Sequence, residues 1–251
     1  MTVRNPDTVL DEAEAYLELQ TLPDGTSLLA ASGSVLYSSV DTLKPGPVYF
    51  LGLNPGGSPQ NNPEGTLGAS LRQSRAGKNE FAHAVWGDPP RQTKPGQSIL
   101  QRRVKTLFAI MGLRTCSVPA SNLVFTRSRN LKSHGNFSAA VTRCKPVHDI
   151  FLNAIQPRLI LTHGNHALVE QALSMKFDRK CCAEHGSWQI RKGHHIHNER
   201  IIHVLNLPHL SFWAMDAITD QGAKRGNILR SILTDPDFNL HSDPRVHARC
   251  R

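Results

Sequence analysis

The stretch Val48-Tyr49-Phe50-Leu51-Gly52-Leu53-Asn54-Pro55-Gly56-Gly57 decides the fold. Its first six residues are an apolar run bounded by turn residues, which is typical of a buried parallel strand. Pro55 keeps Asn54 out of the right-handed helical conformation, so the strand tip presents an amide side chain rigidly. Taken alone, the pattern favours a simple strand-to-loop turn with a capping asparagine, since its glycines match neither GxGxxG nor a Walker loop.

Three further apolar runs, at 122–126, 159–162 and 201–205, predict strands of the same sheet. Amphipathic periodicity predicts helices around them, at 6–20, 101–111, 138–156, 165–175 and about 214–233. Strands that alternate with helices form parallel sheets with helices on both faces. We therefore expect an α/β fold, a three-layer α/β/α arrangement with a central four-stranded parallel sheet.

These elements predict one principal domain, at 47–234. Residues 1–46 are expected to pack on it as a helix and a hairpin at 26–40, and residues 235–251 to form a flexible tail. Residues 58–100 are polar and rich in Gly, Pro, Asn and Gln. Loops of that length are usually functional, so this segment is expected to help form the active site.

Composition restricts the class of protein. The 251 residues include 29 Lys+Arg and 20 Asp+Glu, for a net charge of +9, which favours an anionic partner, nucleic acid first. The five cysteines are odd in number, include the adjacent pair Cys181-Cys182 and form no CxxC. This argues against both a disulfide framework and a Cys-rich zinc site and indicates a reducing cytoplasm. No apolar run approaches the ~20 residues of a membrane span, so a membrane-spanning protein is not expected. We expect a cytoplasmic protein, and a monomer.

Ligands of parallel α/β sheets bind at the carboxyl ends of the strands. That rule selects Asn54 after the first strand and Leu205-Asn206-Leu207-Pro208-His209-Leu210-Ser211 after the last. A histidine at a strand tip can donate a hydrogen bond to a developing anion. The alternative is a surface loop in which Ser211 caps the last helix, and the pattern alone favours it. His163 and His166, after the third strand, either face the site or cap the next helix.

Four segments resemble the uracil-DNA glycosylase superfamily. Leu51-Gly52-Leu53-Asn54-Pro55-Gly56 resembles G-[IL]-N-P-G, the first motif of its mismatch-specific branch, and Pro208-His209-Leu210-Ser211 resembles the H-P-S motif, with Leu210 in place of Pro. Ser121-Asn122-Leu123-Val124-Phe125-Thr126-Arg127 resembles T-N-V-V-K-C-R of the thermophile-type branch. Residues 144–167 resemble that branch's C…I-x-P-x-x-I-x-x-L-G-x-x-A. The resemblance covers about residues 47–57 and 101–233 and implies the superfamily's fold.

The resemblance implies a role for each matching residue. Asn54 would position the water that attacks C1′ of an extruded nucleotide, and His209 would stabilise the departing base as an anion. Asn122 would hydrogen-bond the base edge, and Phe81, or else Trp86, would stack on the base. Gly52 and Leu53 would also contact the base. The residues expected to contact DNA are Gly56, Gly57, Arg127, Arg129, Leu210 and Ser211. Among these, Leu210 would act as an apolar wedge in the minor groove.

No metal or cofactor is expected. Thermophile-type members hold an iron–sulfur cluster through four cysteines, whereas here only Cys144 remains, Thr126 replaces another and no CxxC occurs. Gly193-His194-His195-Ile196-His197-Asn198 contains three histidines, but the spacing lacks the second half of a zinc site, and a hairpin turn is favoured.

We therefore predict a monofunctional DNA glycosylase, a hydrolase that flips a uracil or modified base out of DNA and leaves an abasic site, as in base-excision DNA repair. Uracil is expected from the resemblance alone. Two alternatives stay open: a glycosylase for a bulky, phage-type cytosine in antiviral defence, because 58–100 matches no branch, and a non-catalytic DNA-binding protein with the same fold. A third class, a metal hydrolase that uses the histidine cluster, predicts inhibition by chelators.

Overall fold

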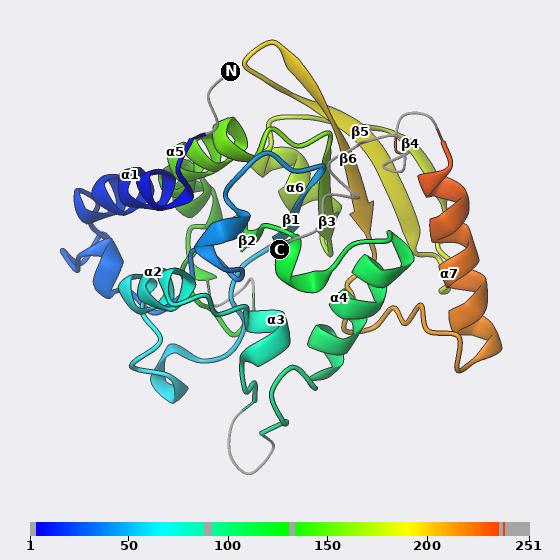
Figure 1. Cartoon of the computed structure of the whole chain (residues 1–251), viewed down its shortest axis with the longest axis horizontal. Coiled ribbons are helices and arrows are strands. Elements are labelled where there is room, and N and C mark those ends of the chain that lie inside the picture. Colours follow the sequence, from blue (N-terminus) through cyan, green and yellow to red (C-terminus); the bar gives the residue numbers. More distant parts are fainter. Residues whose placement is uncertain (1–3, 88–91, 131–133, 236–237, 239–251) are drawn as a thin grey trace.

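A six-stranded mixed sheet forms the centre of the computed structural model, which describes residues 4–87, 92–130, 134–235 and 238 (Figure 1). Four strands are parallel: β1 (Val48–Gly52), β2 (Ala120–Asn122), β3 (Leu159–His163) and β6 (Arg200–Leu207). Antiparallel β5 (Gln189–His197) and β4 (Phe177–Cys182) extend the sheet beyond β6, in the order β2-β1-β3-β6-β5-β4. The α/β class is confirmed.

The prediction of a purely parallel, four-stranded sheet was wrong, because a hairpin adds two strands at one edge. The sequence of β4 is Phe-Asp-Arg-Lys-Cys-Cys, and most of its residues are exposed. Charged, exposed residues are typical of an edge strand, where they discourage pairing with another chain. Such a strand contains no apolar run, so the criterion that finds buried parallel strands overlooks it.

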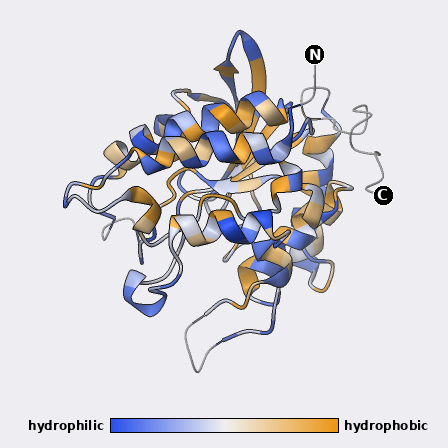
Figure 2. Ribbon diagram, turned by 60° about the vertical axis from the view of Figure 1, so that its left-hand side comes forward, coloured by the Kyte–Doolittle hydropathy of each residue, from blue (hydrophilic) through white to orange (hydrophobic). Residues whose placement is uncertain are grey.

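The strand β1 shows why helices cover both faces of the sheet. All five of its residues are buried, and alternate side chains point to opposite faces. Tyr49 and Leu51 enter one apolar core, and Val48 and Phe50 enter the other. A strand buried on both faces must be covered on both, and hydrophobic segments accordingly lie between two groups of helices (Figure 2).

The helices divide between these two cores. The first core includes residues of α1 (Pro6–Glu18), α2 (Leu67–Arg75), α5 (Phe137–Ile155) and α6 (His166–Ala172). The second includes residues of α3 (Glu80–His83), α4 (Ile99–Ile110) and α7 (Asp220–Leu233). Within the described residues, no helix is long and apolar enough to cross a membrane.

The predicted hairpin at 26–40 was wrong. This segment contains two short 3-10 turns, Leu28–Ala30 and Val40–Thr42, and lies against the sheet edge at β2. Ser34 N donates to Phe125 O at 2.9 Å and Tyr37 N donates to Ala120 O at 2.7 Å, so backbone groups that a hairpin would pair internally are used across the edge. Almost all of the predicted tail, 235–251, lies outside the described residues.

The segment 58–100 is partly helical, since it contains a 3-10 turn at Pro59–Asn61, α2, α3 and the start of α4. Thr66 caps α2 by accepting from Ala69 N at 3.1 Å, and Asn79 caps α3 by accepting from Phe81 N at 3.0 Å. With these caps, a polar, glycine-rich stretch forms short helices that lie beside the ends of β1 and β2.

Candidate functional site

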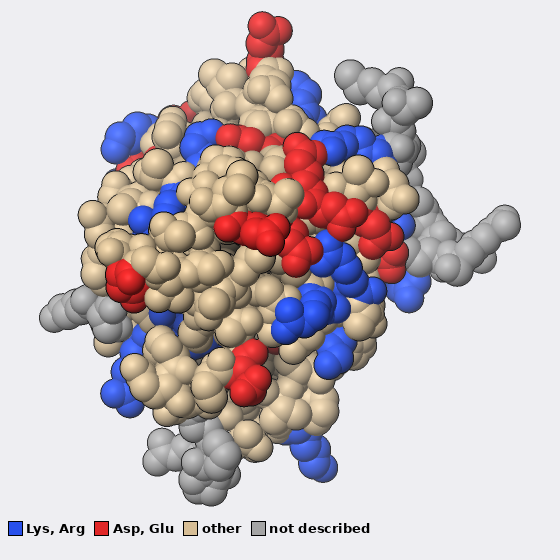
Figure 3. Space-filling view, turned by 90° about the vertical axis from the view of Figure 1, so that its left-hand side faces the viewer, with Lys and Arg blue, Asp and Glu red and all other residues tan. Residues whose placement is uncertain are grey.

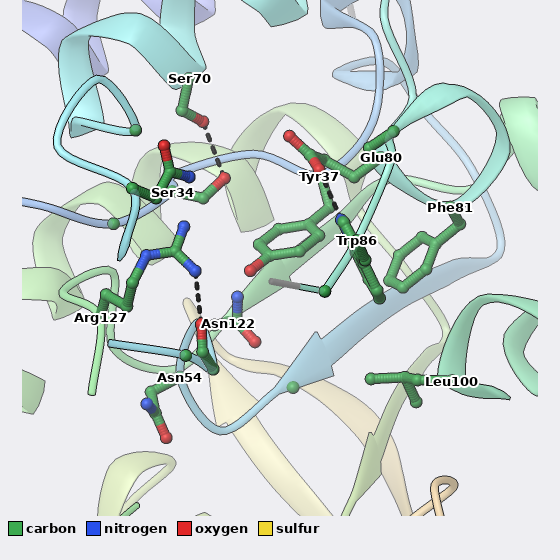
Figure 4. Close-up of a pocket in the computed structure, with 18 of the residues that line it drawn as sticks. Ser34, Tyr37, Asn54, Ser70, Glu80, Phe81, Trp86, Leu100, Asn122 and Arg127 are labelled. Atoms are coloured by element: carbon green, nitrogen blue, oxygen red, sulfur yellow. Dashed lines mark hydrogen bonds between the residues drawn. The ribbon is translucent and has the colours of Figure 1, made fainter. Parts of the chain in front are cut away.

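A cavity of about 1020 Å³ lies at the carboxyl ends of the parallel strands (Figure 4). All of the predicted site residues except Leu210 line it: Gly52, Leu53, Asn54, Gly56, Gly57, Phe81, Trp86, Asn122, Arg127, Arg129, His209 and Ser211. They come from segments that are far apart in the sequence. The fold therefore brings the two motif segments and the 58–100 segment to one place.

The side chain of Asn54 is fixed through its amide nitrogen. Nδ2 donates to Pro55 O and to Ser128 Oγ, both at 2.9 Å. No donor from the described residues occupies Oδ1, which remains able to accept a hydrogen bond. A fixed acceptor of this kind can orient a water molecule or a ligand hydroxyl, although a neutral amide cannot remove a proton from water.

His209 reaches the cavity from the loop after β6. Its Nδ1 accepts from Ser211 N at 3.2 Å, so in the neutral ring the proton is on Nε2. Burial lowers the pKa of His209. The imidazole is therefore neutral at pH 7 and can donate a hydrogen bond through Nε2.

His163, at the end of β3, is a second imidazole of the cavity. It is buried, stacks on Phe50 with ring centroids 5.5 Å apart, and meets the His209 ring edge-to-face at 5.0 Å. Burial, and next the neighbouring His209, lower the pKa of His163 to about 3. Its Nδ1 is buried without a hydrogen-bond partner in the described structure. Asn165 caps α6 instead, and His166 lies outside the cavity lining.

Asn122 and Gly52 are paired in register where β2 and β1 end. A Cβ at Gly52 would lie 2.2 Å from Asn122 Oδ1, so only glycine leaves room for this amide. Asn122 is 6% exposed, and its Nδ2 is buried with no hydrogen-bond partner among the described residues. An amide held in this way presents a donor that a ligand can satisfy.

Aromatic rings form one wall of the cavity. Tyr37 stacks on Phe81 with ring centroids 5.6 Å apart, and Trp86 lies edge-on to both. Phe81 is only 5% exposed, whereas the Tyr37 ring projects toward Asn122 (Figure 4). Burial raises the pKa of Tyr37. The sequence patterns did not indicate Tyr37, which belongs to the segment that was expected to be a hairpin.

Arg127 points into the cavity, toward Ser34 and Tyr37 (Figure 4). Its guanidinium donates to Gly56 O, and its Nε is buried without a hydrogen-bond partner among the described residues. Arg129, by contrast, is exposed at the rim. The two arginines that were both assigned to phosphate contacts thus occupy different environments.

The expectation that Leu210 is an apolar wedge was wrong in this structure. Leu210 is completely buried in the second core, and its carbonyl accepts from Arg103 Nη1 at 2.7 Å. The loop turns this side chain inward and exposes Phe212, which is 64% exposed and lies with its ring 5.6 Å from that of His209.

The positive charge of the chain is not uniform over the surface. On the face that carries α1 and α2, acidic side chains lie among basic ones (Figure 3). Arg75 on this face pairs with Asp11 at 2.6 Å and with Glu14 at 2.7 Å. This face offers no continuous basic surface to a polyanion.

The three histidines near the β5–β6 turn do not form a metal site. Within the described residues, no three His, Cys, Asp or Glu side chains are positioned to hold a metal ion. His195 Nδ1 bonds to Leu173 O at 2.8 Å and His197 Nε2 bonds to Asn153 Oδ1 at 2.8 Å. His194 alternates to the other face of β5, as strand geometry requires.

Comparison of the sequence with family models and with curated proteins gives no match.

Proposed function

We propose that the protein is a DNA glycosylase that extrudes a base from DNA and hydrolyses its N-glycosidic bond, leaving an abasic site. The observation that carries the proposal is the convergence of Asn54 and His209 on one cavity, with Asn122 between β1 and the aromatic wall. An acceptor for water, a donor for a departing anion and a donor for a base edge are the groups this reaction requires.

In the proposed reaction, Asn54 and His209 act at opposite ends of the glycosidic bond that breaks. Asn54 Oδ1 accepts a hydrogen bond from the water that forms the new bond to C1′. As the bond between C1′ and the base nitrogen breaks, its electron pair leaves with the base, and His209 Nε2–H donates a hydrogen bond to the resulting anion. The water oxygen keeps one proton as the new hydroxyl on C1′, and its other proton passes through solvent to the base nitrogen, so the products are an abasic site and a neutral base. A well-placed donor of this kind is worth roughly 10²–10³ in rate. A neutral amide activates water weakly, so stabilisation of the departing base by His209 would supply the larger part of the rate.

Extrusion of the base requires contacts outside the cavity. Exposed Phe212 takes the place of Leu210 as the candidate apolar contact, and Trp188, 37% exposed, lies 6.5 Å from it between ring centroids. Buried Trp213 holds the two loops together, because its Nε1 donates to Ala183 O at 2.7 Å. Rigid aromatic rings beside the cavity suit stacking on bases next to the extruded one.

The size of the cavity favours the alternative of a bulky modified base over uracil. At about 1020 Å³, it reaches the upper end of the range of roughly 300–1,000 Å³ that holds drug-sized ligands. One pyrimidine ring is much smaller than such a ligand. A modified cytosine with a large substituent would use this space, as expected for an enzyme that acts on phage-type DNA.

The proposal is tested by incubating the protein with DNAs that carry different bases and then cleaving abasic sites with alkali. We expect strand breaks at one base or a small group of related bases, and release slower by roughly 10²-fold or more with the Asn54→Ala variant. If the protein binds DNA but produces no breaks with any base, it is a non-catalytic DNA-binding protein and the proposal fails.

A further inference from the structure

One part of the cavity, called the side chamber below, is defined by six of its lining residues: Gly33, Ser34, Tyr37, Ala69, Ser70 and Arg127. Most of these residues are small. The Ser34 and Ser70 hydroxyls are hydrogen-bonded to each other at 2.8 Å, and Ser70 Oγ also accepts from Val35 N at 3.1 Å. The short side chains are thereby held against the wall, and the space in front of them stays open (Figure 4).

Gly33 allows two backbone segments beside this space to approach each other closely. A Cβ at Gly33 would lie 2.0 Å from Phe125 O, so the segment that carries Ser34 lies directly against the chain that leads from β2 to Arg127. The isolated bridge between Gly33 and Thr126 joins the same two segments. The position of Arg127 opposite Ser34 is therefore set by backbone contacts.

The polar atoms that lack partners in this part of the cavity are donors. Arg127 Nε and Asn122 Nδ2 are both buried without a hydrogen-bond partner among the described residues. The ion pairs of the described residues do not include Arg127 with any carboxylate. Leaving a buried donor unsatisfied is costly, most of all on a charged group, so the chamber is complementary to a group that brings acceptors.

We propose that the side chamber binds an oxygen-rich substituent carried by the extruded base, with Arg127 as its main contact. This inference rests on the proposed glycosylase function and specifies its substrate as a pyrimidine with a hydroxylated or glycosylated group on the ring. Guanidinium N–H groups donate to the substituent oxygens, and the small residues opposite leave room for it. A backbone phosphate of the DNA is the other acceptor-rich group that could reach Arg127, and the experiment separates the two.

The test compares release of two bases from otherwise identical DNAs, one with uracil and one with glucosylated 5-hydroxymethylcytosine. For the unaltered protein, we expect the substituted base to be released at least about tenfold faster. Ala69→Phe places a ring in the chamber, and Arg127→Gln removes its charge. Each is expected to reduce the ratio of the two rates about tenfold or more. Ala76→Phe, an exposed position just after α2, is the matched control and should leave the ratio unchanged.

The outcomes separate the two proposals. Faster release of uracil by the unaltered protein, or a ratio that neither chamber variant changes, overturns the side chamber and leaves the glycosylase function standing. A loss of DNA affinity in Arg127→Gln that is equal for both DNAs, with the ratio of rates unchanged, assigns Arg127 to a phosphate and also overturns it. No release from any DNA of the panel overturns both. Thermal denaturation of each variant verifies that it is folded.

Discussion

Two cavities formed by the described residues differ in how their polar groups are paired. The second cavity, of about 660 Å³, lies between α5 and β5. There Lys145 bonds to Asp149 at 2.7 Å and His197 bonds to Asn153 at 2.8 Å. In the first cavity, Asn122 Nδ2, Arg127 Nε and His163 Nδ1 are buried without partners in the described structure.

This difference leaves hydrogen-bonding capacity for a ligand in the first cavity. An unsatisfied buried polar group costs roughly 1–3 kcal/mol of stability, which a ligand can recover by completing the hydrogen bonds. Two histidines of the second cavity, His195 and His197, each already have one ring nitrogen hydrogen-bonded within the fold. In the sequence, the histidine cluster is the more conspicuous feature. In the structure, the hydrogen bonds of its side chains indicate that it stabilises the fold.

The largest expected effect compares one asparagine from each cavity. Asn54→Ala removes the acceptor that would orient the attacking water, so we expect base release to fall roughly 10²-fold or more, with DNA affinity unchanged. Asn153→Ala removes the partner of His197 and is expected to lower the free energy of unfolding by about 1 kcal/mol, with the release rate unaltered. Single-turnover release and chemical denaturation measure the two effects.

Equal loss of release in both variants would contradict the assignment, since Asn153 lies outside the first cavity. So would normal release by Asn54→Ala. That result would leave the fold intact as a DNA-binding protein without this chemistry.

The next effect concerns the buried histidines. His163 has a pKa lowered to about 3 and His148 one lowered to about 4, in both cases chiefly by burial. Because the unfolded chain binds these protons below about pH 6.5 and the folded chain does not, stability is greatest above that pH and falls as the pH decreases toward the folded values. Between about pH 6.5 and its pKa in the folded state, each group changes the free energy of unfolding by about 1.4 kcal/mol per pH unit.

Substitution of one histidine from each cavity isolates this effect. His163→Gln is expected to remove about 1.4 kcal/mol per pH unit from the slope between pH 6 and pH 4, and His195→Gln less, because His195 is only partly buried. Denaturant unfolding at a series of pH values measures both slopes. A slope that is the same in His163→Gln as in the unaltered protein would mean that His163 accepts a proton in the fold.

Sequence patterns predicted the parts of the fold that are buried on both sides. The runs that became β1 and β3 are buried at every residue, so an unbroken apolar stretch identified them. The edge strand β4 and the 26–40 segment were not predicted correctly, since exposure and contacts with distant backbone determine their structure. Tertiary contacts of this kind leave no local periodicity.

The residues of the candidate site likewise include some that the sequence could predict and some that it could not. Asn54 and His209 could be located from the sequence, because both follow parallel strands whose carboxyl ends meet at one edge of the sheet. Tyr37 could not, because it enters from a segment outside the strand–helix alternation. The inward direction of Leu210 could not be predicted either, since a tight loop and the bond from Arg103 determine it. The chemical roles of these residues stay predictions.

A smaller effect is expected when an exposed apolar side chain is replaced by alanine, and two such side chains can be compared. Phe212, 64% exposed, lies beside the first cavity, and Ile201, 65% exposed, lies on the β5–β6 hairpin. Phe212→Ala should weaken DNA binding roughly tenfold, because stacking of an aromatic ring on a base is lost. Ile201→Ala should bind DNA as the unaltered protein does. Fluorescence anisotropy at fixed salt measures both, and equal affinities for the two variants would exclude Phe212 from the DNA contact.

The smallest effect is expected from metal removal, which addresses the second cavity directly. Incubation with a chelator should leave base release within about twofold, since His195 and His197 already bond to Leu173 and Asn153 and the described residues form no group that could hold a metal ion. Ligation through the bonded nitrogens, His195 Nδ1 or His197 Nε2, would cost the existing hydrogen bond, worth about 1 kcal/mol. The opposite result would have three parts: a chelator stops base release, zinc restores it, and His195→Gln releases no base. That result would assign the chemistry to the second cavity.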